Sequence, residues 1–405
     1  MAQHPRGHFS APFADRGGGP DPSVVVWAPG RVNLIGEHID YSLLPVLPMA
    51  IQLGTSLAVA PREDGMVRLR NADSAYADVE IPLSLDVEPG DEGEWGNYAR
   101  GVVQALVRNH GITVGADIAL ESDLPIAAGL SSSTALSGGV ALALLGVNGR
   151  DMDRVELAVA VARAERYTGT HGGEMDQAAI LCGRSGHALH MSFQPLHIRP
   201  VRVPADWIFL VAHSGVVAEK SGPAQITYNA RTMECREALH TVWASMAGGD
   251  PPHRDYRPLL AMADPDHLIE VATGVLTPPL LARFRHTVGE ALRVTEAEKA
   301  LAESDLDTFG RLMEASHQSL RDDFEVSTPE LDRIVDVAIA AGAAGARLTG
   351  AGLGGAALIL CAGHAEEGVR ESLASGYYGP REVSASEDVL FRTVPSGGAT
   401  VTRLD

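Results

Sequence analysis

The sequence has few cysteines and little positive charge. Its three cysteines, Cys182, Cys235 and Cys361, lie far apart and form no CxxC pair, which argues against a disulfide framework and against a zinc site. We therefore expect the reducing cytoplasm as its compartment. Lys and Arg total 32 against 52 Asp and Glu, a formal net charge of -20, so broad contact with nucleic acid or an anionic membrane is not expected.

Long apolar segments are also missing. No stretch is apolar for long enough to cross a bilayer, and the Gly-, Pro- and His-rich residues 1–22 lack the apolar centre of a signal peptide. We predict a flexible tail there. The rest is long enough for two domains, which we predict over residues 23–200 and 201–405, with the boundary near residues 195–204. The order of elements is mixed, of the α+β class, with strands concentrated in the first half and helices in the second.

Hydrophobic periodicity predicts most of the elements. Short apolar runs bounded by Pro, Gly or Asp are typical of strands, and a 3.6-residue spacing is typical of helices. We predict strands over residues 24–27 (ending at Pro29-Gly30), 46–60, 66–70, 77–81, 116–121, 186–193, 207–212, 346–349, 356–361 and 389–394. We predict helices over residues 95–109, 136–147, 153–167 and 223–246, a further element from Glu174, a surface loop over 248–257, and three helices between 278 and 341, separated near Ser304 and Ser327.

A serine-rich stretch lies between a predicted strand and a predicted helix. It runs from Asp123 to Leu136 and contains Gly129-Leu130-Ser131-Ser132-Ser133-Thr134. A small-residue loop before a helix N-terminus presents free backbone N–H groups and a positive dipole end, which together hold a phosphate. The alternative is an ordinary serine cap on a buried core helix, and the stretch alone fits both.

A polar cluster follows the first predicted strand. Ionisable and amide side chains crowd the segment from residue 31 to residue 41: Arg31, Asn33, Glu37, His38 and Asp40. Polar groups near a core need a ligand or one another as partners. The alternating donors and acceptors of this cluster suit a polyhydroxylated ligand. The alternative is a solvated loop whose charges pair with one another.

Two glycines precede a candidate proton acceptor. Gly172 and Gly173 allow the backbone to approach a ligand closely, and Asp176 follows them. A carboxylate beside an arginine can accept or orient a hydroxyl proton, and we predict Arg31 as that neighbour. The alternative is that Asp176 merely occupies the first turn of a helix, where the dipole favours acidic residues.

A glycine-rich motif, Gly350-Ala351-Gly352-Leu353-Gly354-Gly355, fits the dinucleotide fingerprint G-x-G-x-x-G only in its letters. That fingerprint opens a helix after the first strand of its domain, whereas a strand is predicted here at residues 356–361. We therefore predict a glycine turn between two strands that presses on a ligand or on another loop. A Walker P-loop is excluded because no G-x-x-x-x-G-K-S/T run occurs.

Taken in chain order, the polar cluster, the serine-rich stretch and the glycine turn resemble the three signatures of the GHMP small-molecule kinases. Residues 30–41 closely resemble the galactokinase signature. The stretch from Ser319 to Ser327 is also similar to galactokinases, and the resemblance spans residues 24–394. It implies a two-domain α+β fold: an N-terminal ribosomal-protein-S5-like domain with left-handed βαβ character, a C-terminal α+β domain with the glycine turn 349–355, and the active site in the cleft between them.

The resemblance also implies an ATP-dependent kinase that phosphorylates the anomeric C1 hydroxyl of a hexose such as galactose, with ATP and Mg²⁺ as cofactors. Asp176 matches the catalytic aspartate, and Arg31 matches the arginine that steadies it and the transferring phosphoryl group. The sugar-binding positions are matched by Glu37, His38, Asp40, Gly173 and Tyr228. The loop around the ATP phosphates is matched by Gly129, Leu130, Ser131, Ser132, Ser133 and Thr134, and the Mg²⁺ positions by Ser133 and Glu165.

The choice of sugar rests on less typical residues. Tyr228 stands where galactose-specific members carry tyrosine. Three other segments are similar to the N-acetylgalactosamine kinase branch: Gly36-Glu37-His38-Ile39-Asp40, Glu165-Arg166-Tyr167 with Gly172-Gly173, and Met233-Glu234-Cys235-Arg236. Ser42-Leu43-Leu44-Pro45 replaces the usual polar residue and glycine, so we expect another path for the turn beside the sugar. Glu174 replaces a small or apolar residue, and its carboxylate would raise the pKa of Asp176, touch an unusual substituent or point to solvent.

Two other functions stay open at the level of sequence. A non-catalytic galactokinase-like sensor would have lost residues of the serine loop, which is uninterrupted here. A GHMP kinase for a non-sugar alcohol such as mevalonate or homoserine is disfavoured by the segment Glu37 to Tyr41. The expected partners are a small-molecule sugar and ATP, and the sequence leaves open whether the protein is a monomer or a homodimer.

Overall fold

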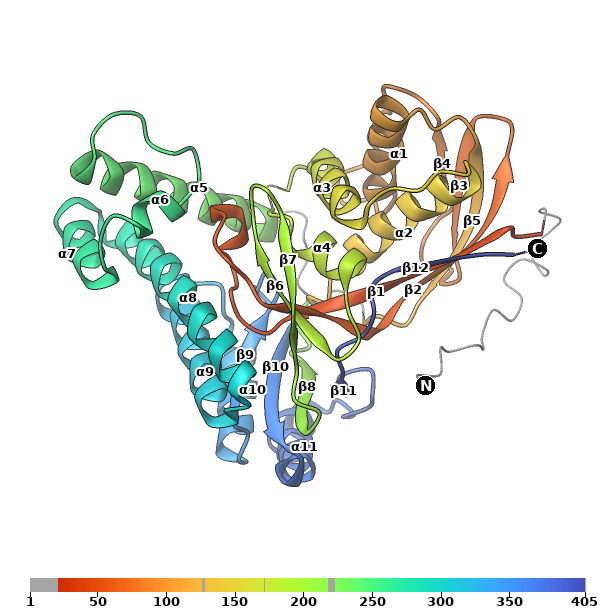
Figure 1. The fold of residues 1–405 in the computed structure, drawn as a ribbon. Helices are drawn as coiled ribbons and strands as arrows, with labels where there is room; N and C mark the ends of the chain where they lie inside the picture. The colour runs from red at the N-terminus through yellow and green to blue at the C-terminus, as the bar shows by residue number, and fades with distance from the viewer. Residues whose placement is uncertain (1–20, 126–127, 171, 218–222, 405) are drawn as a thin grey trace.

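The computed structural model describes residues 21–125, 128–170, 172–217 and 223–404, which form two main sheets with helices packed beside them (Figure 1). The first sheet has six strands in the order β12-β1-β2-β5-β3-β4, and every neighbouring pair is antiparallel except β3 and β5. Its strands are β1 (Val24–Asn33), β2 (Pro48–Arg62), β3 (Met66–Asn71), β4 (Val79–Pro82), β5 (Gly115–Ser122) and β12 (Thr400–Arg403).

The strand β1 is longer than predicted. The predicted end at Pro29-Gly30 is wrong, because the pairing with β2 only shifts register between Pro29 and Arg31 and then continues. Such a bulge bends a strand without ending it. A Cβ added to Gly30 would lie 2.8 Å from the carbonyl oxygen of Leu130, so the glycine lets the serine loop rest directly on the strand.

Four helices accompany the first sheet: α1 (Gly96–His110), α2 (Ser132–Val147), α3 (Arg154–Glu165) and α4 (Met175–Cys182). The helix α2 packs on β1 and β2 and also contacts α1, α3 and α4. Since it is covered on several sides, it is apolar all round. Its small residues permit this closeness, and a Cβ on Gly139 would lie 2.7 Å from the Leu57 side chain.

The second sheet has four antiparallel strands in the order β11-β8-β10-β9, and a separate hairpin pairs β6 with β7. The strands are β6 (His187–Ser192), β7 (His197–Arg202), β8 (Trp207–His213), β9 (Gly345–Thr349), β10 (Ala356–Ala362) and β11 (Leu390–Thr393). Residues 350–355 join β9 to β10. The predicted glycine turn between two strands is therefore confirmed.

The second half of the chain supplies the remaining α-helices of the described residues, and these pack partly on one another and partly on the second sheet. They are α5 (Pro223–Met246), α6 (Arg257–Leu260), α7 (Pro265–Val275), α8 (Pro278–Glu303), α9 (Leu306–Asp322), α10 (Pro329–Ala340) and α11 (Glu366–Leu373). Figure 1 shows α8 and α9 side by side as long helices, and α9 and α10 pack on β9. The three helices predicted between residues 278 and 341 are confirmed, with their breaks at Ser304 and near Ser327.

The sequence analysis did not predict five of the described elements: β7, α6, α7, α11 and β12. The strand β7 occupies much of the predicted boundary 195–204, where alternating exposed polar residues and Pro200 resemble a linker. The last strand, β12, pairs with β1, so the chain returns to the first sheet after completing the second. The division at residues 200 and 201 stays a prediction. Within the described ranges, no helix is both long and apolar enough to cross a membrane.

Candidate functional site

The centre of the site is an ion pair between Arg31 and Asp176. Arg31 lies on β1 just beyond its bulge, and Asp176 lies in the first turn of α4. Arg31 donates from Nε to Oδ1 at 2.6 Å and from Nη2 to Oδ2 at 2.7 Å, and its Nη1 donates to the carbonyl oxygen of Gly129 at 2.5 Å. Burial disfavours the guanidinium charge, but Asp176 more than offsets it and raises the pKa of Arg31. The predicted neighbourhood of the two residues is confirmed.

The serine loop also contacts Asp176. Ser131 precedes α2 in a left-handed conformation, with φ of 62°, and its side chain makes no capping hydrogen bond to the helix. Instead its hydroxyl donates to Oδ2 of Asp176 at 2.5 Å. This contact was not predicted, because sequence spacing gives no link between residues 131 and 176. Ser131 is therefore not an ordinary helix cap.

The glycine turn presses against the serine loop. Gly350 has φ of +84°, and a Cβ there would lie 2.7 Å from the carbonyl oxygen of Gly129. A Cβ on Gly129 would in turn lie 2.9 Å from the carbonyl oxygen of Thr349. Both positions thus combine a left-handed backbone with a close approach, which only glycine tolerates. The glycine turn also contacts the polar cluster of residues 31–41, because the amide of Gly350 donates to Oε1 of Glu37 at 2.5 Å.

Glu37 is held by donors from both halves of the chain. Its other oxygen, Oε2, accepts from Nδ2 of Asn33 at 2.7 Å, and Arg347 approaches Oε1 at 3.8 Å. Burial raises the pKa of Glu37, and the charge of Arg347 works in the opposite direction. Beneath it, the buried Glu290 accepts from the amide of Gly36 at 2.9 Å. This support fixes the loop that carries Glu37, His38 and Asp40.

His38 and Asp40 occupy the next part of the loop. His38 Nε2 lies 3.1 Å from the carbonyl oxygen of Ala351, and its ring lies 5.5 Å from that of Tyr228. Burial lowers the pKa of His38 to about 3, so the ring is neutral. Burial, and then the charge of Asp176, raise the pKa of Asp40 to about 7. A Cβ on Gly173 would overlap the Asp40 carboxylate, so the second glycine of the pair is required there.

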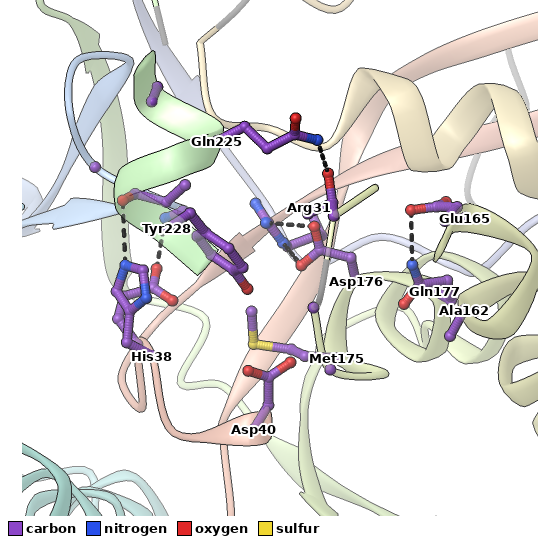
Figure 2. Close-up of a pocket in the computed structure, with 18 of the residues that line it drawn as sticks. Arg31, His38, Asp40, Ala162, Glu165, Met175, Asp176, Gln177, Gln225 and Tyr228 are labelled. Carbon is purple, nitrogen blue, oxygen red and sulfur yellow. Dashed lines mark hydrogen bonds and ion pairs between the residues drawn. The ribbon is translucent and has the colours of Figure 1, made fainter. Parts of the chain in front are cut away.

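These residues surround a cavity of about 100 Å³. Figure 2 shows Tyr228 projecting from α5 between His38 and the Arg31–Asp176 pair. The predicted sugar-binding residues Glu37, His38, Asp40, Gly173 and Tyr228 all line this cavity, as do Arg31, Asp176 and Glu165. The structure therefore brings together residues that lie almost two hundred positions apart in sequence.

Sequence reasoning missed Gln225, which also lines the cavity. Its Nε2 donates to Oγ1 of Thr170 at 2.9 Å and to the carbonyl oxygen of Thr168 at 3.0 Å. Gln225 lies three residues before Tyr228 on α5, and residues at this spacing share a helix face. The helical register of the predicted helix was thus a usable signal.

Two atypical features of the sequence, Glu174 and the segment Ser42-Leu43-Leu44-Pro45, do not line the cavity. Glu174 does not line it and instead borders a separate groove with Arg163 and Arg166. The turn after Tyr41 places Leu43 in a left-handed conformation with φ of 62°. A leucine adopts this conformation at a cost of about 1–2 kcal/mol. The burial of Leu43 and Leu44 in the core offsets that cost.

Glu165 lies between the serine loop and the helix that carries Asp176. Its Oε2 accepts from Nε2 of Gln177 at 3.0 Å and from Oγ1 of Thr134 at 3.4 Å. Across the described residues, no three His, Cys, Asp or Glu side chains are grouped as a metal cage. Mg²⁺ takes one or two carboxylates and completes its shell with water and substrate phosphates. The carboxylate of Glu165 and the hydroxyl of Ser133 fit such a site.

Three family models match the chain. They are the galactokinase galactose-binding signature over residues 11–61, the GHMP kinases N terminal domain over residues 97–184 and the GHMP kinases C terminal domain over residues 297–379. A galactokinase of Roseiflexus sp. (strain RS-1) is 39% identical over 361 residues, which cover 88% of this chain and 88% of that relative.

Solved structures show the same similarity. The structure of Lactococcus lactis galactokinase complexed with galactose has a TM-score of 0.83 at 31% identity, and the match covers 93% of this chain and 95% of the other. Methanococcus jannaschii mevalonate kinase has a TM-score of 0.60 at 19% identity over 92% of this chain and 98% of the other. The second likeness concerns the fold alone.

Proposed function

Because this chain belongs to the galactokinase family of the GHMP kinases, we propose that it transfers the γ-phosphoryl group of ATP to the C1 hydroxyl of galactose. The products are galactose 1-phosphate and ADP. The observation that carries the proposal is the bidentate Arg31–Asp176 pair facing a cavity lined by Glu37, His38 and Asp40.

Asp176 is the proposed catalytic residue. Its carboxylate accepts a hydrogen bond from the C1 hydroxyl, whose oxygen attacks the γ-phosphorus of ATP. As the new O–P bond forms, the bond between the γ-phosphorus and its bridging oxygen breaks, ADP leaves, and the hydroxyl proton passes to Asp176. The Arg31 guanidinium favours the ionised carboxylate and lies beside the charge that develops on the phosphoryl group.

The serine loop and α2 are proposed to hold the ATP phosphates. The N-terminus of α2 supplies backbone N–H groups and a positive dipole end close to Ser131. In phosphoryl transfer a protein acts mainly by positioning the reactants and by neutralising charge. The residues proposed for this task are Gly129, Leu130, Ser131, Ser132, Ser133 and Thr134.

Ser133 and Glu165 are the residues we propose to hold Mg²⁺. When bound, the ion neutralises charge on the ATP phosphates. Gln177 and Thr134 both donate to Oε2 of Glu165. They thereby fix the direction of this carboxylate relative to α2.

Sugar recognition is proposed to depend on the far end of the cavity. Glu37 and Asp40 offer carboxylate oxygens, and Tyr228 offers a hydroxyl whose pKa burial raises well above its usual value. Neutral His38 packs against Tyr228 and Phe324, which holds this wall in place. Gly173 leaves room for the Asp40 carboxylate to face the ligand. We further propose a cytoplasmic location and either a monomer or a homodimer.

A steady-state ADP-release assay tests the function. The panel is galactose, N-acetylgalactosamine, glucose, galacturonate and arabinose, with mevalonate and homoserine as non-sugar alcohols. We expect the highest kcat/KM with galactose. A higher value with N-acetylgalactosamine would assign the chain to that branch, and a lack of turnover with every sugar would contradict the kinase assignment in favour of a sensor.

A further inference from the structure

A second cavity, of about 430 Å³, adjoins the candidate site. The two cavities share Gly172, and Tyr41 and Ser42, which directly follow Asp40, line the second one. We call it the arginine pocket after the cationic residues that line it: Arg166, Arg236, Arg254 and His253.

The cations of the arginine pocket come from three separate segments. Arg166 begins the short 3-10 helix η2 (Arg166–Thr168) after α3, Arg236 lies on α5, and His253 and Arg254 lie in the loop before α6. Among the described residues that line the pocket, none is Asp or Glu. In a chain of net charge -20, such a meeting of positive charges indicates an anionic ligand.

As far as the structure describes the chain, Arg166, Arg236 and Arg254 lack the ion pairs that most of the other described arginines make. Over the part of the chain that the structure describes, no ion pair or side-chain hydrogen bond joins Arg166, Arg236 or Arg254 to another group. The nearest acidic residue in the loop, Asp255, is engaged by Arg257 at 2.7 and 2.8 Å. The charges of Asp40 and Glu174 act on Arg254 only through space.

This arrangement disfavours the positive charge of the partly buried Arg254. Burial and then the charge of Arg166 lower the pKa of Arg254, which means that its charged form is disfavoured where it stands. A like charge beside a partly buried guanidinium costs free energy unless an opposite charge joins them. A bound anion would remove this cost.

We propose that the arginine pocket binds a phosphate group, free or carried by a small phosphomonoester, outside the cavity that contains Asp176. Arginine forks match the oxygens of phosphate in bidentate geometry, and a phosphate dianion balances several guanidinium charges better than a single carboxylate does. The cavity volume also exceeds what one phosphate group fills, which leaves space for an organic remainder. This site does not depend on the proposed function.

Isothermal titration calorimetry of the full chain with inorganic phosphate, at low ionic strength, tests the proposal. The titration is run without and then with a saturating nonhydrolysable ATP analogue, which occupies the serine loop in the second case. We expect saturable binding that Arg254→Gln and the exposed Arg236→Gln each weaken about tenfold, with a smaller loss for Arg254→Lys. Arg184→Gln removes the same charge from an exposed position outside the pocket and should leave binding unchanged.

Methyl phosphate and acetate are the comparison probes. Tighter binding of methyl phosphate than of inorganic phosphate identifies an organic phosphate as the ligand class, and the reverse order identifies free phosphate; either supports the pocket. Acetate binding as tight as phosphate binding overturns the assignment to phosphate. Phosphate binding that the analogue abolishes, or that Arg184→Gln weakens equally, overturns the pocket itself, and so does a lack of binding. No turnover is measured, so these outcomes are independent of the sugar kinase activity.

Discussion

At Asp176, both carboxylate oxygens accept hydrogen bonds from Arg31, and Ser131 adds a third donor. Asp176→Asn would turn an amide N–H toward the guanidinium and remove the proton acceptor. We expect kcat to fall by roughly 10²–10⁴, with the Kd of an ATP analogue nearly unchanged. Steady-state kinetics and calorimetry measure the two effects, and Asp78→Asn on the exposed surface serves as control. Near-normal turnover of Asp176→Asn would remove Asp176 from the proposed mechanism.

Gly173 is sensitive to the smallest possible enlargement. The methyl group of Gly173→Ala would overlap the Asp40 carboxylate and force it out of place. We expect the KM for galactose to rise about tenfold or more, since at least one hydrogen bond between the sugar and Asp40 is lost, while the KM for ATP stays close to that of the wild type.

The matched control for this change is Gly368→Ala. Gly368 lies on α11 with open space around it, and alanine is the better helix former. Kinetic parameters of the control should equal those of the wild type. If Gly173→Ala also left the KM for galactose unchanged, Asp40 would have no part in holding the sugar.

At the scale of elements, a capping role and a catalytic role can be distinguished for Ser131 at the start of α2. Ser131 makes no capping bond to α2, whereas Asp153 caps α3 by accepting from the amides of Val155 and Glu156. Asp153→Ala should therefore lower the free energy of unfolding by about 1 kcal/mol without changing kcat. Ser131→Ala should do the opposite, with little change in stability and a kcat that is about tenfold lower.

Urea unfolding and ADP-release kinetics on both variants measure these effects. A Ser131→Ala variant that is as unstable as Asp153→Ala and keeps the wild-type kcat would make the serine an ordinary cap after all. The pair of variants separates the two interpretations that the serine-rich sequence allows.

The elements also show where sequence reasoning reaches its limit. Long periodic segments such as α5 and α8 were predicted closely, because their patterns are local. The strand β1 was predicted too short, since Pro29-Gly30 looks like an end but forms a bulge on β2. β12, with the sequence Thr-Val-Thr-Arg, carries almost no apolar pattern and exists because β1 offers it an edge.

Within the site, the predictable contact was the one between groups of opposite charge, Arg31 and Asp176. A carboxylate after two glycines and an arginine after a strand were expected to meet, and they do. The contacts of Ser131 with Asp176 and of Gly350 with Glu37 were not predictable, because they depend on how two loops from different sheets lie against each other. The roles of these residues in catalysis and binding stay predictions.

For the whole molecule, Asp40 links stability to pH. Burial and Asp176 raise its pKa from 3.8 to about 7 in the folded protein, so the folded state holds this proton more tightly than the unfolded chain does. The contribution of Asp40 to stability is therefore present in full below about pH 4 and is lost as the pH rises through about 7.

Asp40→Asn removes this dependence. Relative to the wild type, the variant should gain up to about 4 kcal/mol of unfolding free energy between about pH 4 and about pH 8.5. Urea unfolding of both proteins across this range gives the difference at each pH, in which titrations elsewhere in the chain cancel. A difference that stays constant with pH would show that Asp40 is ionised at an ordinary pKa.

The pairing of β12 with β1 has a consequence for the synthesis of the protein. The ribosome makes β1 before every other strand of the two sheets and β12 after all of them, so the outer edge of β1 lacks its neighbouring strand until β12 has been made. An uncovered strand edge is a template for strands of other chains. The outer edge of β1 is therefore open to pairing with other chains until β12 has emerged and joined it.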